Sequence, residues 1–352
     1  MLFQKKKDIL GIDIGSSAIK LVQLKQQKGS YLLQNIGLVP LPAEAIVDNA
    51  LMDSSSIVET IKKLIKSLNL KDKEVASSIS GNSVIIRKIS LPVMPPEELD
   101  EQIHWEAEQY IPFDINDVNI DFQLLPQEDI DATKMNVLLV ASKKDIIDDY
   151  LTVFNESGLK LVVMDVDSFA VQNAFEFNYD ADPEDVYALI NIGASMMNFN
   201  IVKGGVSLFT RDVQMGGNLY TEEIQKYYSL GSDEAERIKL TGDSPGEGQL
   251  TDVTGRINDT LAIEIRRSLD FYNSNAGELG RITKVFLSGG CAKMAMLSST
   301  VGDRLGLPVE LLNPFQKIKY NDKEFDPEYL QEIGPLMTVA LGLATRRHGD
   351  KW

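Results

Sequence analysis

The stretch DILGIDIGSSAIKLV, residues 8–22, decides the fold of the chain. It predicts a short apolar strand, a turn formed by Gly15, Ser16 and Ser17, and a second strand. A glycine in this turn would allow a positive φ and leave the next backbone N–H groups uncovered, and the two serines add hydroxyl donors. The turn could therefore hold a phosphate, with Asp13 facing a bound cation. Taken alone, the pattern also fits an ordinary hairpin turn.

The same pattern occurs a second time in the chain. IDIGSS, residues 12–17, aligns with INIGAS, residues 190–195, and the two glycines, Gly15 and Gly193, stand 178 positions apart. In both places, three short strands joined by glycine-containing turns predict an antiparallel meander. A repeat at such a long spacing indicates two related domains rather than a solenoid of short units. Two such domains could close on one ligand, with one glycine turn from each.

Composition limits the class of protein. A length of 352 residues fits about two domains of about 150 residues, and 43% hydrophobic residues suffice for sizeable cores. The formal net charge of -17 argues against binding to nucleic acid, which requires clustered Lys and Arg. One cysteine and two histidines argue against disulfides and zinc sites. With no long apolar stretch and no secretory signal, we expect the protein to stay in the cytoplasm.

The order of the predicted elements divides the chain into segments. Ser56 and Glu59 predict a capping box at the start of an amphipathic helix. Residues 92–131 are rich in Pro, Asp and Glu and indicate an insertion, and apolar residues at helical spacing over 257–272 predict a long helix. We expect the first domain to begin with residues 1–81. An inserted small α/β subdomain should follow over residues 82–157, and the return strand and connecting helix of the first domain should cover residues 158–184. The second domain should cover residues 185–334. A closing helix and the tail should cover residues 335–352.

Several motifs, in their order along the chain, resemble a known superfamily. The two hairpins, residues 165–170 before a helix, FLSGG at 286–290 and a final helix of small residues occur as they do in the actin-like ATPases, which include actin, the heat-shock chaperones, MreB and FtsA. Over essentially its whole length, the chain is most similar to the PilM family of type IV pilus assembly. The more specific signals are LPVMPPEELDEQIHWEAEQYIPFD, AIEIRRSLDFY and GSDEAERIK. The resemblance implies an α/β fold with duplicated actin-like (ribonuclease H-like) domains and an FtsA-type inserted subdomain.

The resemblance also implies a site for ATP and Mg²⁺ between the two domains. The first phosphate loop would be formed by Gly15, Ser16 and Ser17, and the second by Gly193, Ala194 and Ser195. Asp13 would hold Mg²⁺ through water, with Asn191 as a second candidate on the metal side. The chain has no G-x-x-x-x-G-K-[ST] loop. An adenosine-side subdomain of the second domain would contribute Gly217, Glu236, Lys239, Gly289, Gly290 and Met294. From the residues alone, Glu236 and Lys239 could be a surface pair, and Gly289 and Gly290 a plain turn.

Asn191 departs from the superfamily pattern, in which this position is commonly an Asp. An amide keeps the hydrogen bonding but removes a charge next to the cation, so we expect ATP binding with slow or absent hydrolysis. Asp167, with Asp165 as its neighbour, resembles the residue that orients the lytic water in relatives. Asp13 and Asp167 are therefore the catalytic candidates, although Asp167 could equally cap a helix.

The resemblance implies a protein partner as well. In PilM-like proteins, a groove beside the inserted subdomain receives the cytoplasmic N-terminal tail of PilN, an inner-membrane protein of the pilus machine. The candidate anchors in this chain are Trp105, Tyr110, Ile111, Pro112 and Phe113, beside Glu106 and Glu108. Such a surface suits an extended apolar peptide with flanking positive charge. These residues could instead form the core of the insert.

We therefore expect a nucleotide-bound scaffold at the inner face of the inner membrane, which docks PilN and other components of the pilus machine. One alternative is a hydrolysing or polymerising actin-like ATPase of the MreB or FtsA kind. A second is a sugar kinase, but such an enzyme would need a carboxylate base near the second hairpin, where this chain has Asn191. The machine could also be a related secretion system.

Overall fold

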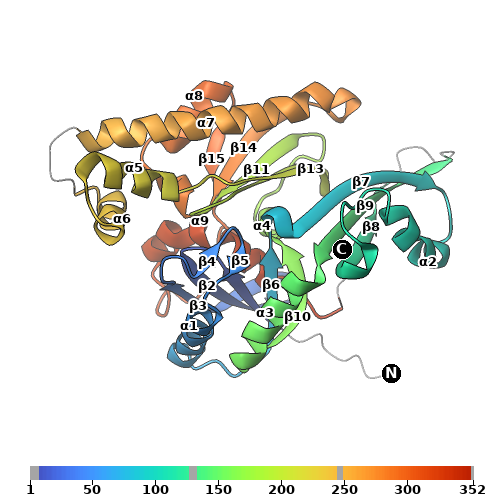
Figure 1. Ribbon diagram of the computed structural model, residues 1–352, viewed down its shortest axis with the longest axis horizontal. Helices are drawn as coiled ribbons and strands as arrows, with labels where there is room; N and C mark the ends of the chain where they lie inside the picture. Colours follow the sequence, from blue (N-terminus) through green and yellow to red (C-terminus); the bar gives the residue numbers. More distant parts are fainter. Residues whose placement is uncertain (1–7, 127–132, 244–248, 350–352) are drawn as a thin grey trace.

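The computed structural model describes residues 8–126, 133–243 and 249–349, and contains two five-stranded sheets, one from each half of the chain (Figure 1). A three-stranded sheet and a two-stranded hairpin are added to the first half. In the described part of the chain, none of the helices combines the length and apolar character needed to span a membrane.

The first sheet has the strand order β10-β6-β1-β2-β3. Its central strand β1 is buried along its whole length, which explains its nearly continuous apolar sequence. Strands β1, β2 and β3 pair antiparallel as a meander, whereas β6 lies parallel to both β1 and β10. The strands are β1 (Leu10–Ile14), β2 (Ala18–Gln27), β3 (Ser30–Pro40), β6 (Glu74–Ile79) and β10 (Lys160–Val166).

The second sheet repeats this arrangement with the order β13-β12-β11-β14-β15. Its first three strands form an antiparallel meander, and β14 lies parallel to β11 and β15. The register is repeated too, because Asp13 faces Lys20 in the first sheet and Asn191 faces Asn198 in the second. The internal repeat predicted from the sequence is confirmed. The strands are β11 (Val186–Ile192), β12 (Met197–Lys203), β13 (Val206–Val213), β14 (Ile282–Ser288) and β15 (Val309–Leu311).

Helices α4 (Asp167–Asn178) and α9 (Pro327–Ala344) pack against each other between the two sheets (Figure 1). Their contact is close at Gly342, where a Cβ atom would lie only 1.8 Å from the carbonyl oxygen of Ala170. A glycine is therefore required there, and the small residues of the final helix are explained by this packing.

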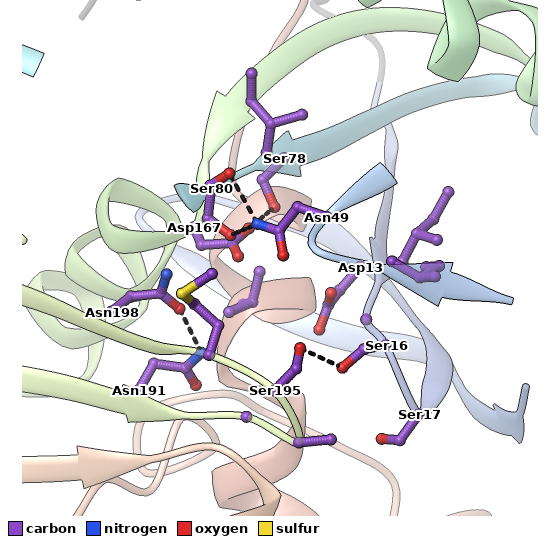
Figure 2. A pocket seen from close by; sticks show the side chains of 18 of the residues that line it. Asp13, Ser16, Ser17, Asn49, Ser78, Ser80, Asp167, Asn191, Ser195 and Asn198 are labelled. Atoms are coloured by element: carbon purple, nitrogen blue, oxygen red, sulfur yellow. Dashed lines mark hydrogen bonds between the residues drawn. The ribbon is translucent and has the colours of Figure 1, made fainter. Parts of the chain in front are cut away.

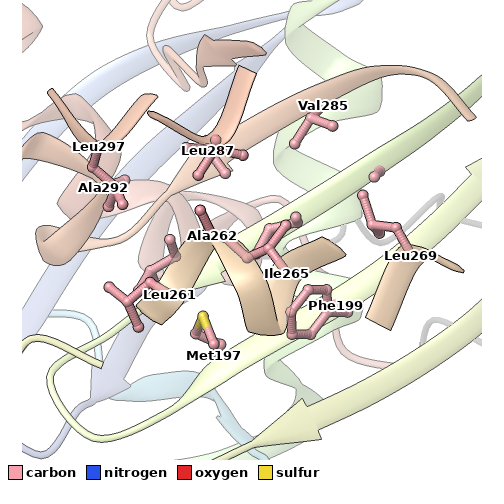
Figure 3. Close-up of a cluster of buried hydrophobic side chains, with 14 of the residues drawn as sticks. Met197, Phe199, Leu261, Ala262, Ile265, Leu269, Val285, Leu287, Ala292 and Leu297 are labelled. Carbon is pink, nitrogen blue, oxygen red and sulfur yellow. The ribbon is translucent and has the colours of Figure 1, made fainter. Parts of the chain in front are cut away.

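The outer helices cover the other faces of the sheets. In the second half, Leu261, Ile265 and Leu269 of α7 pack onto β12 and β14, as Figure 3 shows, which confirms the predicted long helix. In the first half, α1 begins after Asp53, whose side chain accepts from the N–H of Ser56. The predicted capping box at Ser56 is therefore wrong by one helical turn. The helices are α1 (Ser54–Ser67), α3 (Lys144–Glu156), α5 (Asn218–Tyr228), α6 (Ser232–Thr241), α7 (Gln249–Asn275) and α8 (Leu297–Leu305), with short helices η3 (Gly277–Leu279) and η4 (Gly290–Lys293).

The inserted subdomain follows β6 through the short helix η1 (Gly81–Ser83). Its antiparallel sheet has the order β7-β9-β8 and carries α2 on one face, with Leu99, Ile103 and Ala107 in a core of its own. Residues of its other face pack onto Phe169 of α4 and Val206 of β13. The elements of the insert are β7 (Val84–Pro92), α2 (Pro96–Ala107), η2 (Ile115–Asp117), β8 (Val118–Leu124) and β9 (Lys134–Lys143).

Two further elements belong to the first half. Helix α3 follows β9 directly and places Tyr150, Val153 and Phe154 in the core of the first sheet, together with α1. The hairpin of β4 (Ile46–Val47) and β5 (Ala50–Leu51) lies between β3 and α1 in the sequence.

Candidate functional site

The two glycine hairpins face each other across a polar pocket between the two halves (Figure 2). The hydroxyl of Ser195 donates to that of Ser16, with 2.9 Å between the two Oγ atoms. The space in and around the pocket, together with the adjoining space open to solvent, is about 680 Å³. Besides both hairpins, it is lined by Asp13, Lys20, Asn49, Ser78, Ser80, Tyr150, Asp167, Asn191 and Asn198.

The glycines of the two hairpins lie where a side chain would have close neighbours. Neither Gly15 nor Gly193 has a positive φ, so the conformation predicted for Gly15 is wrong. A Cβ atom on Gly15 would lie 2.9 Å from Nζ of Lys20, and one on Gly193 would lie 3.2 Å from the carbonyl oxygen of Met196. Each glycine N–H donates within its own hairpin, to Ala18 and Met196 respectively. A phosphate would therefore have to be met by the N–H groups and hydroxyls of the residues that follow.

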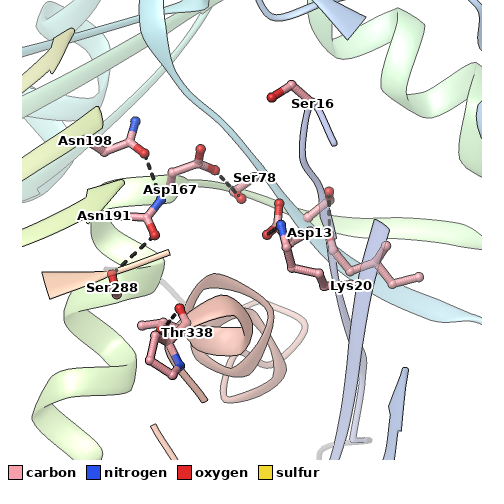
Figure 4. A network of polar contacts seen from close by, with 12 residues as sticks. Asp13, Ser16, Lys20, Ser78, Asp167, Asn191, Asn198, Ser288 and Thr338 are labelled. Carbon is pink, nitrogen blue, oxygen red and sulfur yellow. Dashed lines mark hydrogen bonds and ion pairs between the residues drawn. The ribbon is translucent and has the colours of Figure 1, made fainter. Parts of the chain in front are cut away.

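Lys20 is a pocket residue that the sequence reasoning missed. Its ammonium lies 2.8 Å from a carboxylate oxygen of Asp13, and both side chains are largely buried (Figure 4). The signal was present in the hairpin itself, because strand pairing after a short turn places Lys20 opposite Asp13. The pair puts one cation and one carboxylate on the first-half wall of the pocket.

The second half carries amides where the first half carries charges. Asn191 Nδ2 donates to Oδ1 of Asn198 at 3.1 Å, and the hydroxyl of Ser288 donates to Oδ1 of Asn191 at 3.2 Å (Figure 4). By register, Asn191 and Asn198 stand where Asp13 and Lys20 stand in the first sheet. This wall of the pocket can hydrogen-bond a ligand without adding charge.

Asp167 reaches the same pocket from the first turn of α4. It does not cap the helix, since the N-cap is Val166, and it accepts instead from the hydroxyl of Ser78 at 2.6 Å. Burial and the nearby charge of Asp13 raise the pKa of Asp167 to about 6, against the lowering effect of the hydroxyls of Ser78 and Ser80. A cation in the pocket would relieve the repulsion between the two carboxylates.

Asp165 does not share this environment. Its carboxylate is fully buried, 3.5 Å from Nε of Arg346, near the end of the chain. Burial raises its pKa to about 6, although Arg346 opposes the shift. Asp165 is a buried structural charge and does not line the pocket among the described residues.

The residues predicted for the adenosine side gather next to the second hairpin. Lys239 Nζ lies 2.6 Å from a carboxylate oxygen of Glu236 and 3.0 Å from the hydroxyl of Thr221, which joins α6 to α5. The N–H of Gly217 donates to the carbonyl of Gly193. Gly289 has a φ of +86°, and a Cβ there would lie 2.3 Å from the carbonyl oxygen of Ile192.

Two further members of this group follow β14. Gly290 begins η4, and Met294 follows it as the C-cap residue and packs against the core of the second sheet. The lining of the pocket, within the described part of the chain, does not include the adenosine-side group. The group therefore adjoins the pocket through the second hairpin and α5.

The residues predicted for the partner groove divide into two sets. Trp105 on α2 is 75% exposed and Tyr110 is 39% exposed, and Pro112 also faces solvent. Ile111, in contrast, is 5% exposed and belongs to the core of the insert. Phe113 packs against that core, with Nζ of Lys143 4.4 Å above its ring.

Two carboxylates of the described residues, those of Asp13 and Asp167, are available to a metal ion in the pocket. No group of three or more His, Cys, Asp or Glu residues that could hold a metal occurs in residues 8–126, 133–243 and 249–349. Asp13 and Asp167 both reach the pocket, and Mg²⁺ bound to phosphates needs only one or two carboxylates besides water. The donor set therefore fits a metal–nucleotide complex.

Comparison with known proteins places the chain in a family. Residues 11–348 match the family described as type IV pilus assembly protein PilM. The structure of a PilM–PilN type IV pilus biogenesis complex matches with a TM-score of 0.88 and 30% identity, covering 97% of this chain and 99% of that one. The cell division protein FtsA of Neisseria meningitidis is 22% identical over 377 residues, covering 95% of this chain and 90% of FtsA. An MreB protein of Spiroplasma citri bound to AMPPNP, with a TM-score of 0.50, 13% identity and coverage of 96% and 95%, shares the fold. The predicted actin-like fold is confirmed, and the chain belongs to the PilM family of type IV pilus assembly proteins.

Proposed function

We propose that the protein is a cytoplasmic ATP-binding scaffold of the type IV pilus machine, which docks the N-terminal cytoplasmic tail of a PilN-like inner-membrane protein beside its insert. The observation that carries the proposal is the pair of equivalent hairpins facing each other across one polar pocket. The fold is shared with an MreB protein bound to AMPPNP, and the structure with the TM-score of 0.88 is a PilM–PilN complex.

ATP would place its β- and γ-phosphates between the two hairpins. The N–H groups and hydroxyls of Ser16, Ser17 and Ser195 would meet the phosphates from the two halves, with Lys20 as the nearby cation. In this arrangement the phosphates replace the direct contact between Ser16 and Ser195. The nucleoside would extend toward Gly217, Lys239 and the turn at Gly289, where the absence of side chains permits a close approach.

Mg²⁺ would sit on the carboxylate side of the phosphates. Asp13 and Asp167 would hold it through water, and Asn191 would offer only a neutral amide oxygen. Because the second hairpin lacks a carboxylate at this position, we propose that ATP is held for long periods and is hydrolysed slowly. This slow turnover suits a scaffold more than a motor.

The partner tail would bind on the solvent face of the insert. Trp105 and Tyr110 are large exposed aromatic side chains, of the type that dominates binding energy at interfaces. The helix that carries Trp105 is acidic, with Glu97, Glu98 and other carboxylates along it. An apolar segment with adjacent positive charges is the complementary ligand. We leave Ile111 out of this surface because it is buried in the insert.

A peptide-binding measurement tests the docking surface. A fluorescent peptide with the sequence of the cytoplasmic tail of the cognate PilN should bind the wild-type protein, and Trp105→Ala or Tyr110→Ala should weaken binding by about tenfold, as expected for aromatic anchors. Phe271→Ala is the matched control, since this aromatic side chain is 59% exposed on α7, outside the insert. Unchanged affinity in both insert variants, or an equal loss in Phe271→Ala, would remove the assignment of this surface.

A further inference from the structure

A row of polar side chains leads from the nucleotide pocket to the edge of the second sheet. Ser288, Asn191, Asn198 and Asp212 lie at one register level on the neighbouring strands β14, β11, β12 and β13. Each is bonded to the next: Ser288 to Asn191, Asn191 to Asn198 at 3.1 Å, and Asn198 Nδ2 to Oδ1 of Asp212 at 2.9 Å. Asn191 and Asn198 line the pocket, so the row begins where the ligand would be.

The far end of this row is bonded to the other half of the molecule. The second carboxylate oxygen of Asp212 accepts from the backbone N–H of Gly81 at 2.5 Å. Gly81 has a φ of +67°, and a Cβ there would lie 2.8 Å from Nδ2 of Asn49 and 3.0 Å from Cε of Met196, so the chain is closely confined at this point. Asp212 is therefore held from both sides, by a pocket residue and by the first half.

Gly81 is also the first residue of the connection to the insert. It begins η1, which leads directly into β7, and β7 extends from the centre of the molecule toward α2 at the far end of the insert (Figure 1). The opposite face of the insert rests on Phe169 and on Val206, at the start of β13. The orientation of the insert thus depends on contacts made with the same strand that carries Asp212.

We propose that Asp212 is a positioning residue that couples nucleotide binding in the pocket to peptide binding on the insert. This inference rests on the proposed function and adds its regulation. The two states differ in the bond between Asp212 and Gly81, which is present in the structure and is broken when the two halves separate. A nucleotide that contacts both hairpins replaces the bond between Ser16 and Ser195 but links the two halves through its phosphates. It therefore favours the state in which Asp212 holds Gly81, which fixes the base of the insert and strengthens binding of the tail.

The coupling can be measured from two dissociation constants. The affinity of the labelled PilN-tail peptide is determined by fluorescence anisotropy with and without saturating AMPPNP and Mg²⁺. For the wild-type protein, the nucleotide should tighten peptide binding by about fivefold or more, the lower end of typical allosteric coupling. In Asp212→Ala both ligands should still bind, but the ratio of the two peptide constants should fall to about one, within about twofold.

Two further variants separate this row from general contact between the halves. Asp212→Asn keeps the volume of the side chain but replaces one of its two acceptor oxygens by an amide NH2 group, which cannot accept from Asn198 or from the N–H of Gly81. The ratio should therefore fall in this variant even if Asp212→Ala does not fold. Gln214→Ala removes another bond between the halves, the 2.6 Å bond to Asp48 at an exposed site, and should keep the wild-type ratio.

The outcomes distinguish failure of this inference from failure of the proposed function. If the wild-type protein binds neither AMPPNP nor the peptide, the proposed function is wrong and the coupling falls with it. If both bind but the nucleotide leaves peptide affinity unchanged or weakens it, the inference alone is overturned. It is also overturned if Asp212→Ala and Asp212→Asn keep the wild-type ratio, or if Gln214→Ala loses it equally.

Discussion

Asp13 and Asn191 hold equivalent places in the two sheets, but only Asp13 carries a charge. Asp13 is paired with Lys20, whereas Asn191 bonds two neutral neighbours, Asn198 and Ser288. The pocket is thus asymmetric, with its charges on the first-half side. Electrostatic stabilisation of a reacting phosphate depends on such charges. If the pocket holds ATP as proposed, the second hairpin would contribute to binding more than to catalysis.

This asymmetry predicts slow turnover that a single substitution can raise. With Mg²⁺ and ATP, the wild-type protein should release phosphate at about one per minute or less, far below the ~1–100 s⁻¹ of protein kinases. Asn191→Asp should increase the rate, because it restores a carboxylate beside the metal. The rate measured for Asp13→Ala gives the background of phosphate release that does not depend on this carboxylate. A wild-type rate well above one per minute that Asp13→Ala abolishes would contradict slow turnover.

The raised pKa of Asp167 predicts a dependence of stability on pH. Its pKa rises from 3.8 to about 6, so the folded state binds the proton more tightly than the unfolded state between these values. The charge of Asp167 therefore lowers the free energy of unfolding as the pH rises through this window, and the full cost is present above it. Asp167→Asn should stabilise the protein at pH 7 by about 1–3 kcal/mol, at ~1.4 kcal/mol per pKa unit, with little effect at pH 4. Urea unfolding of both proteins at pH 4 and pH 7 measures the change in the free energy of unfolding. An equal change at the two pH values, or a destabilised variant at pH 7, would show that the charge of Asp167 does not destabilise the folded protein.

Among the helices and strands, those with a regular spacing of apolar residues were predicted correctly from the sequence. The two meanders and the row of apolar residues on α7 could be predicted because a buried strand or helix face needs apolar residues at a fixed spacing. The insert gave the same kind of signal. Leu99, Ile103 and Ala107 recur every four residues on α2 and form its buried face, and Trp105 lies off that stripe and is exposed.

The failures at this scale also have physical causes. Asp53 and Ser56 are both good N-cap residues, and the sequence does not say which of them the chain will place before the first turn. Gly15 was expected to need a positive φ, but its φ is not positive, and a Cβ there would lie close to Nζ of Lys20 across the hairpin. Ile111 looked like a surface anchor, but the chain turns back into the core of the insert after α2.

In the whole molecule, the two hairpins predicted from the sequence repeat do face each other. That they bind one ligand between them stays a prediction. The contacts between the halves could not be predicted, because they join residues far apart in the chain. The bond from Gly81 to Asp212 spans 131 positions, and neither residue stands in a recognisable motif. The pattern of residues in one sequence predicts buried faces and turns. Polar contacts between distant residues can be identified only when the relative position of the two sheets is known.

Calorimetric titration shows directly whether the two halves bind one ATP between their hairpins. Protein freed of bound nucleotide is titrated with AMPPNP and Mg²⁺ as wild type, Gly15→Val and Gly255→Val. Gly15→Val fills the space beside Lys20, whereas a Cβ on Gly255 would have no neighbour within 4 Å. We predict one nucleotide per chain for wild type and Gly255→Val, and binding weaker by about tenfold or more, about 1.4 kcal/mol, for Gly15→Val. Absence of nucleotide binding to the wild-type protein, or equal affinity in the wild type and both variants, would show that ATP does not bind between the two hairpins.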